Sequence, residues 1–179
     1  METRKRKTNV TIWSLIVILL ISVCLILSDT PVAAETMKYR VSAYLTDVGF
    51  IPVGDTEGHI VGHYTRRGLA FFENGEVATY THWGTFDFTK GIGPYIGYSI
   101  FTYEDGSTIV QKIQGPFEWA PGRKMRVFTG MGEFIKGTGR FEGIKGTVSF
   151  SGKEVTPSSK ETKSDIYFDN TATYTLPPK

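Results

Sequence analysis

The sequence has little cysteine and, outside its first residues, no excess of either charge. Its single cysteine, Cys24, lies within residues 1–34, so the remaining chain can form no disulfide, thiolate metal site or cysteine nucleophile. The same 34 residues hold four of the 20 basic residues and two of the 18 acidic ones, which leaves 16 of each sign. The basic character therefore belongs to this segment, and we expect no nucleic-acid partner.

Residues 1–34 have the order of a secretory signal peptide. A basic cluster, Arg4–Lys7, precedes an apolar-dominated run from Ile12 to Leu27, and small residues in Val32-Ala33-Ala34 suit cleavage before Glu35. An uncleaved anchor is the alternative, but this 16-residue run is shorter than the roughly 20 residues that span a bilayer. We expect a secreted or periplasmic protein with a signal peptide at 1–34, one domain at 35–179 and no stable membrane span after cleavage.

The chain after Lys38 lacks apolar residues at helical spacing. Apolar and polar residues instead alternate with a period of two in short segments separated by glycine-rich breaks. Asn74-Gly75 and Asp105-Gly106 are strong signals for tight hairpin turns. Asp47 to Asp55, with two Gly and one Pro, reads as a loop. We expect eight or nine strands, at about 40–45, 57–64, 68–72, 77–88, 95–103, 108–114, 125–131, 146–151 and 166–176.

An antiparallel set of this size hides its edges most simply by closing into a barrel. We therefore predict an all-β fold, an eight-stranded antiparallel barrel, with a two-sheet sandwich as the alternative. The interior of such a barrel is either filled by side chains or large enough for one small ligand. Aromatic residues, 13% of the chain, are concentrated between Phe71 and Trp119, as expected of a barrel wall.

The segment Gly137-Thr138-Gly139-Arg140-Phe141-Glu142-Gly143-Ile144-Lys145-Gly146 resembles a motif of allene oxide cyclases, and its Gly-Thr-Gly-x-Phe stretch is similar to one in dirigent proteins. Gln114-Gly115-Pro116-Phe117 is similar to a second cyclase motif. The resemblance implies an eight-stranded barrel and a homotrimer. Independently of any family, glycines suit a chain that leaves one strand and re-enters another, with Phe141 plugging a barrel end.

The resemblance does not extend to the cyclase reaction. Those enzymes use a Glu and Asn pair on the first strand and a cysteine in the barrel. Here the corresponding segment, Tyr39 to Tyr44, has no acid or amide, and no cysteine follows Cys24. Whether the chain is an enzyme is left open by its sequence. If it is one, the resemblance implies an isomerase or cyclase.

The candidate ligand-binding residues come from the aromatic-rich region. Gln111 interrupts the apolar face formed by Ile109, Ile113 and Phe117, which is typical of an apolar pocket with one orienting polar group, or else Gln111 faces solvent at a sheet edge. Five further side chains complete the predicted set: Tyr80, His82, Tyr98, Phe117 and Trp119.

The three histidines, His59, His63 and His82, could only form a metal site if strand geometry brought them together. The His59 and His63 rings are about 13 Å apart along a regular strand, too far for one metal ion. We therefore expect no metal and no other cofactor.

Other chemistries lack their motifs: there is no Gly-x-Ser-x-Gly elbow and no glycine loop that leads into a helix. Three functions remain. The first is binding of a small hydrophobic molecule in the barrel. The second is a cyclising or stereo-directing enzyme, which should have a titratable residue such as Glu57, His82 or Asp87 in the cavity. The third is an interaction module with a filled barrel and an exposed apolar patch.

Overall fold

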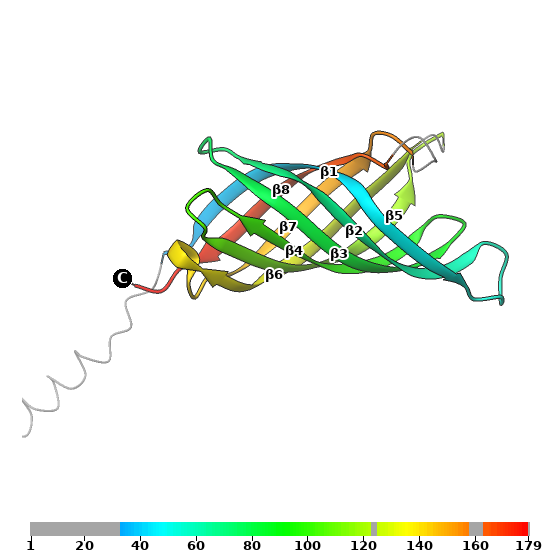
Figure 1. Ribbon diagram of the computed structural model, residues 1–179, viewed down its shortest axis with the longest axis horizontal. Helices are drawn as coiled ribbons and strands as arrows, with labels where there is room; N and C mark the ends of the chain where they lie inside the picture. The colour runs from blue at the N-terminus through cyan, green and yellow to red at the C-terminus, as the bar shows by residue number, and fades with distance from the viewer. Residues whose placement is uncertain (1–32, 123–124, 158–162, 179) are drawn as a thin grey trace, which may run out of the picture. The chain divides into compact units, whose positions relative to one another are not determined.

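The structure is a computed structural model that describes residues 33–122, 125–157 and 163–178. Eight antiparallel strands form a closed barrel in which sequence neighbours pair and β8 pairs with β1 (Figure 1). They are β1 (Glu35–Pro52), β2 (His59–Phe72), β3 (Val77–Thr89), β4 (Gly93–Thr102), β5 (Thr108–Trp119), β6 (Arg126–Thr138), β7 (Lys145–Glu154) and β8 (Ile166–Thr175), with a 3-10 turn η1 (Gly139–Phe141) between β6 and β7. The predicted all-β, eight-stranded antiparallel barrel is confirmed.

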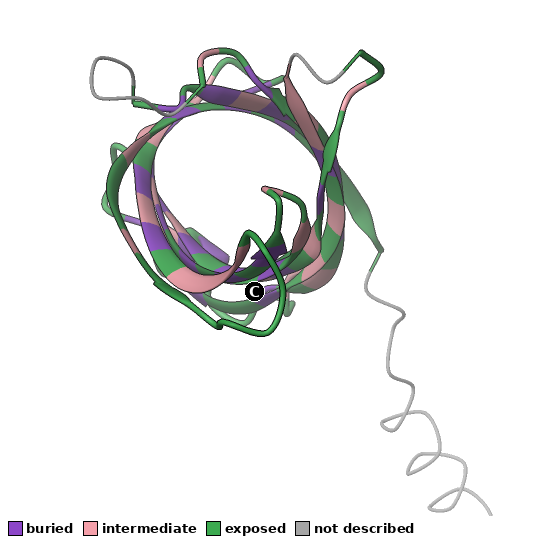
Figure 2. Cartoon of the chain, turned by 90° about the vertical axis from the view of Figure 1, so that its right-hand side faces the viewer, coloured by how far each residue is buried: buried purple, intermediate pink, exposed green. Residues whose placement is uncertain are grey.

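Buried and exposed residues alternate along the strands because successive side chains point to opposite faces. The alternation is visible as colour bands when the ring of strands is viewed from its end (Figure 2). The predicted hairpin turns are confirmed: Gly75 and Gly106 have φ of 86° and 80°, the left-handed region that glycine adopts without a Cβ clash.

Some predicted boundaries are wrong. The segments expected at 57–64 and 68–72 form one strand, β2, which continues through Arg66. The loop expected from Asp47 to Asp55 is strand up to Pro52, because β1 resumes pairing with β2 after a bulge between Leu45 and Asp47. The glycine-dense segment before Gly139 is likewise the second half of β6.

Aromatic rings fill the interior, and glycines in the wall make room for them. Gly84 of β3 and Gly97 of β4 are register partners. A Cβ at Gly84 would lie 2.6 Å from Cζ of Tyr64, and one at Gly97 would lie 2.4 Å from Cε1 of His82. Each ring therefore packs against bare backbone, which a strand of larger residues would not allow.

The barrel end that carries η1 is closed by stacked side chains. Phe141 is buried against the Tyr103 ring, with centroids 4.8 Å apart. The Arg140 guanidinium lies over both rings and forms an ion pair with Glu76. These contacts close this end of the described barrel.

Candidate functional site

A chain of hydrogen-bonding side chains lies inside the barrel. His82 of β3 is 1% exposed, with Nδ1 2.9 Å from Ser99 Oγ and Nε2 3.1 Å from the Tyr64 hydroxyl. Ser99 Oγ in turn donates to the Tyr80 hydroxyl at 3.3 Å. The four residues come from β2, β3 and β4, because inward positions on adjacent paired strands are neighbours.

This chain is electrically neutral. Burial, and then the charge of Arg66, lower the pKa of His82 to about 3. Burial raises the pKa of Tyr80 to about 12 and raises that of Tyr64 as well. At neutral pH the site therefore presents an uncharged imidazole and intact hydroxyls, which are hydrogen-bonding groups rather than a poised general base.

A charged network adjoins the neutral chain. Arg66 of β2, 5% exposed, donates to the Ser164 carbonyl at 2.6 Å and to Ser164 Oγ at 3.1 Å. Ser164 Oγ donates to Glu154 Oε1 at 2.7 Å. Arg126 donates to both oxygens of Glu154, at 3.0 and 2.7 Å, in a bidentate pair.

The space left between these groups is small. A cavity of about 20 Å³ remains inside the barrel, little more than one water molecule requires. The interior is thus packed rather than hollow. The cavity is lined by hydrogen-bonding and apolar side chains from six strands and by Ile166 and Phe168 of β8: Tyr64, Arg66, Tyr80, His82, Tyr95, Ile113, Phe117, Phe128 and Phe150.

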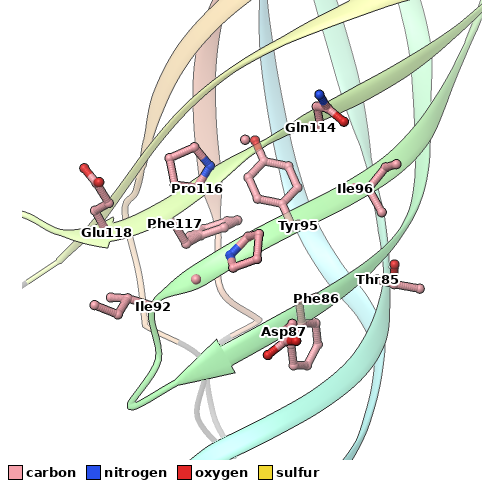
Figure 3. Close-up of a pocket in the computed structure, with 13 residues that line it drawn as sticks. Thr85, Phe86, Asp87, Ile92, Tyr95, Ile96, Gln114, Pro116, Phe117 and Glu118 are labelled. Atoms are coloured by element: carbon pink, nitrogen blue, oxygen red, sulfur yellow. The ribbon is translucent and has the colours of Figure 1, made fainter.

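A larger concavity lies across β3, β4 and β5. It is an open groove of about 830 Å³ (Figure 3), within the size range of ligand sites. Tyr95 and Phe117 line both this groove and the inner cavity, so the two spaces adjoin at these residues. Pro94 and Pro116 are register partners there, and neither has an N–H to donate to the β4–β5 ladder.

The predicted ligand-binding residues divide between the two faces of the wall. Tyr80, His82, Gln111 and Phe117 are buried inside. Gln111 accepts a hydrogen bond from the Tyr39 hydroxyl at 2.9 Å, and its Nε2 has no partner among the described residues. Of the two positions considered for Gln111, the structure therefore has the buried one.

Tyr98 and Trp119 lie apart from this group. Tyr98 is 45% exposed and opposite Trp83 on the outer face of the wall. Trp119, at the end of β5, is 38% exposed and donates from Nε1 to the Lys90 carbonyl at 3.2 Å. Neither residue lines the inner cavity.

The other histidines and the candidate acids lie outside the barrel interior. His59 Nδ1 is 2.5 Å from Asp55 Oδ1 and its Nε2 is 2.8 Å from Asp87 Oδ1. The hydrogen bond to Asp55, then that to Asp87, raises the pKa of His59. Glu57 is exposed and pairs with Lys90. Within the described residues, no cluster of His, Cys, Asp and Glu could hold a metal ion.

Sequence reasoning missed Arg66, Ser99, Glu154 and Ser164. Ser99 could have been found, because it shares the inward parity of Tyr95 and Phe101 on β4. Arg66 and Glu154 carried no such signal, since charged residues in strands usually face solvent. Their common partner, Ser164, lies 98 residues from Arg66 in the chain.

No helix among the described residues is long and apolar enough to cross a membrane.

No family model and no curated protein matches the chain. Among solved structures, a conserved protein of unknown function from Rhodopseudomonas palustris is 11% identical, covering 81% of this chain and 99% of its own, with a TM-score of 0.49. A pterocarpan synthase dirigent protein is 12% identical, covering 85% of this chain and 96% of its own, with a TM-score of 0.46. The chain's own strand order is that of a closed eight-stranded antiparallel barrel.

Proposed function

We propose that this is an exported barrel that binds a small, mainly hydrophobic molecule. The observation that carries the proposal is the shared wall formed by Tyr95 and Phe117, where a groove of ligand size adjoins a cavity lined by hydrogen-bonding groups. A ligand would lie in the groove with its body against these rings, and rotation of Phe117 would admit one end of it to the interior.

The composition of the site supports binding rather than hydrolysis or acid–base catalysis. The groove is lined largely by apolar and aromatic side chains, with Gln114 and two acids at its rim. Within the cavity, the titratable imidazole of His82 is neutral and has both nitrogens in hydrogen bonds. A cyclising or stereo-directing activity would in this site depend on the shape of the pocket rather than on a charged acid or base.

Native mass spectrometry of the protein isolated from its own host tests this proposal. We expect a noncovalent adduct of one small molecule per chain. Phe117→Trp, which adds bulk to the shared wall, should lose most of the adduct, whereas Tyr98→Phe on the outer face should keep it. A wild-type protein that carries no adduct under mild ionisation would contradict ligand binding.

A second candidate function is self-association through the outer wall. Trp83 and Tyr98 are cross-strand partners and are 47% and 45% exposed. Nearby on the same face, Ile96 of β4 and Met131 of β6 are 37% and 70% exposed and both pair with Gln114 of β5. Large exposed apolar side chains on adjacent strands favour an interface between proteins.

Light scattering coupled to size-exclusion chromatography measures this association directly. We expect the wild-type protein to have the mass of a trimer, the assembly that the sequence resemblance implies. Trp83→Lys combined with Tyr98→Lys should reduce it to one chain, because a lysine in a buried interface is left without a partner. Ile135→Lys, at an equally exposed position elsewhere on β6, is the matched control. A wild-type monomer at micromolar concentration would exclude this function.

A further inference from the structure

Arg66 is a buried cation that is incompletely satisfied. Its two terminal nitrogens donate to Ser164, but its Nε is buried and has no hydrogen-bond partner among the described residues. Arginine remains protonated in proteins, although burial lowers the pKa of this guanidinium below its ordinary value. The Nε–H of this buried cation therefore lacks the hydrogen bond that it would make in water.

The neighbouring carboxylate does not neutralise Arg66. Both oxygens of Glu154 already accept hydrogen bonds from Arg126, and Oε1 also accepts one from Ser164. Arg126 and Glu154 form a neutral pair, which leaves the charge of Arg66 in excess. The other hydrogen-bonding residues of the cavity, including Tyr64 and His82, carry no negative charge.

The backbone at Ser164 is strained so as to hold Arg66 in place. Ser164 is fully buried and has φ of 48°, a left-handed conformation that few residues other than glycine adopt. In this conformation both its carbonyl and its hydroxyl are hydrogen-bonded to Arg66. Strain of this kind is found at sites where geometry serves a function.

We propose that the molecule bound by this barrel is an anion, a small aromatic or aliphatic carboxylate whose charged end is held by Arg66 inside the cavity. The inference rests on ligand binding as proposed above and specifies the class of ligand. The apolar body would remain in the groove against Phe117, because the cavity of about 20 Å³ beside Arg66 can admit only the charged end, once Phe117 has rotated. A carboxylate would supply the missing acceptor for Nε and balance the buried charge.

Benzoate and benzyl alcohol test this proposal, because they share a ring and differ in charge. We expect the wild-type protein to bind benzoate about ten- to a hundredfold more tightly than benzyl alcohol in calorimetric or NMR titrations, as for a hydrogen bond to a charged group. Arg66→Met should abolish this preference. Arg66→Lys, which keeps the charge but loses the planar fork, should retain part of it.

Glu154→Gln provides a second variant with an effect of opposite sign. It removes a negative charge near Arg66 and, at a temperature where this less stable variant is fully folded, should raise benzoate affinity several-fold. A variant whose only change was a looser barrel would bind benzoate more weakly. Equal binding of benzoate and benzyl alcohol by the wild type, unchanged by Arg66→Met, would overturn the anion proposal and leave ligand binding intact. Binding of neither probe, with no adduct on the natural protein, would overturn both.

Discussion

Glu154→Gln is expected to lower the free energy of unfolding by about 3–5 kcal/mol, because it leaves the Arg126 guanidinium without the buried carboxylate with which it pairs. Glu154 is 3% exposed and accepts hydrogen bonds from Arg126 and from Ser164, which in turn accepts hydrogen bonds from Arg66. For a domain of about 145 residues this corresponds to a fall in Tm of roughly 10–16 °C. Chemical denaturation monitored by tryptophan fluorescence measures the change.

The matched control is Glu133→Gln. Glu133 is an exposed carboxylate on β6, opposite Thr147 of the strand that carries Glu154. Its replacement should change stability by no more than about 0.5 kcal/mol. Equal effects of the two substitutions would show that the network around Glu154 contributes nothing specific.

The effect of Glu154→Gln should also depend on pH. Burial opposes ionisation of Glu154, but the hydrogen bonds from Arg126 outweigh it and hold the pKa of this carboxyl below its ordinary value of 4.5. Since the folded-state pKa is the lower one, the stabilisation is complete above pH 4.5 and is lost as the pH falls through the folded-state pKa. The difference in free energy of unfolding between wild type and variant should become smaller in acid. A constant difference from pH 7 to pH 3 would contradict the lowered pKa of Glu154.

The barrel itself was predictable because each strand obeys one local rule. Alternation of apolar and polar residues identified strands such as β3, and Asn74-Gly75 and Asp105-Gly106 fixed two of the hairpins. Glycine misled where it serves packing rather than turning. Gly132, expected in the connection after the strand at 125–131, lies within β6, where a Cβ would be 2.7 Å from Cγ2 of Ile113 and 3.1 Å from Cγ1 of Val148, contacts between strands that composition does not reveal.

The site was predictable in part, for a related reason. Alternation correctly indicates that Tyr80, His82 and Phe117 share the inward face of their strands. Tyr98 was expected beside them on account of its aromatic ring, yet Gly97 and Ser99 occupy the inward positions of β4 because the His82 ring needs that room. Pairings such as that of Arg66 with Ser164 form only once the barrel closes, so no local pattern specifies them.

Glycines in the barrel wall leave room for the large rings inside, so a methyl group at such a glycine should destabilise the fold. Gly84→Ala should destabilise the barrel by about 1–3 kcal/mol, because its methyl group would lie 2.6–2.7 Å from the Tyr64 ring and hydroxyl. Tyr64→Ala alone should cost about 3–5 kcal/mol, the range for removal of a buried aromatic ring. In that background the methyl group has free space, and Gly84→Ala should cost less than about 0.5 kcal/mol.

A double-mutant cycle of these two substitutions, measured by denaturant unfolding, isolates the contact between ring and glycine. Gly75→Ala serves as the control, since a Cβ there meets open space but the residue has φ of 86° and its substitution is strained for a reason unrelated to Tyr64. Its cost should be the same with and without the Tyr64 ring. If Gly84→Ala also lowers the free energy of unfolding equally with and without the Tyr64 ring, Gly84 is required for backbone conformation. In that case the contact between the Tyr64 ring and the strand does not determine where the ring lies. If the cost of Gly84→Ala disappears with the ring, the wall glycines determine where the rings lie, and through them the shape of the cavity beside Arg66.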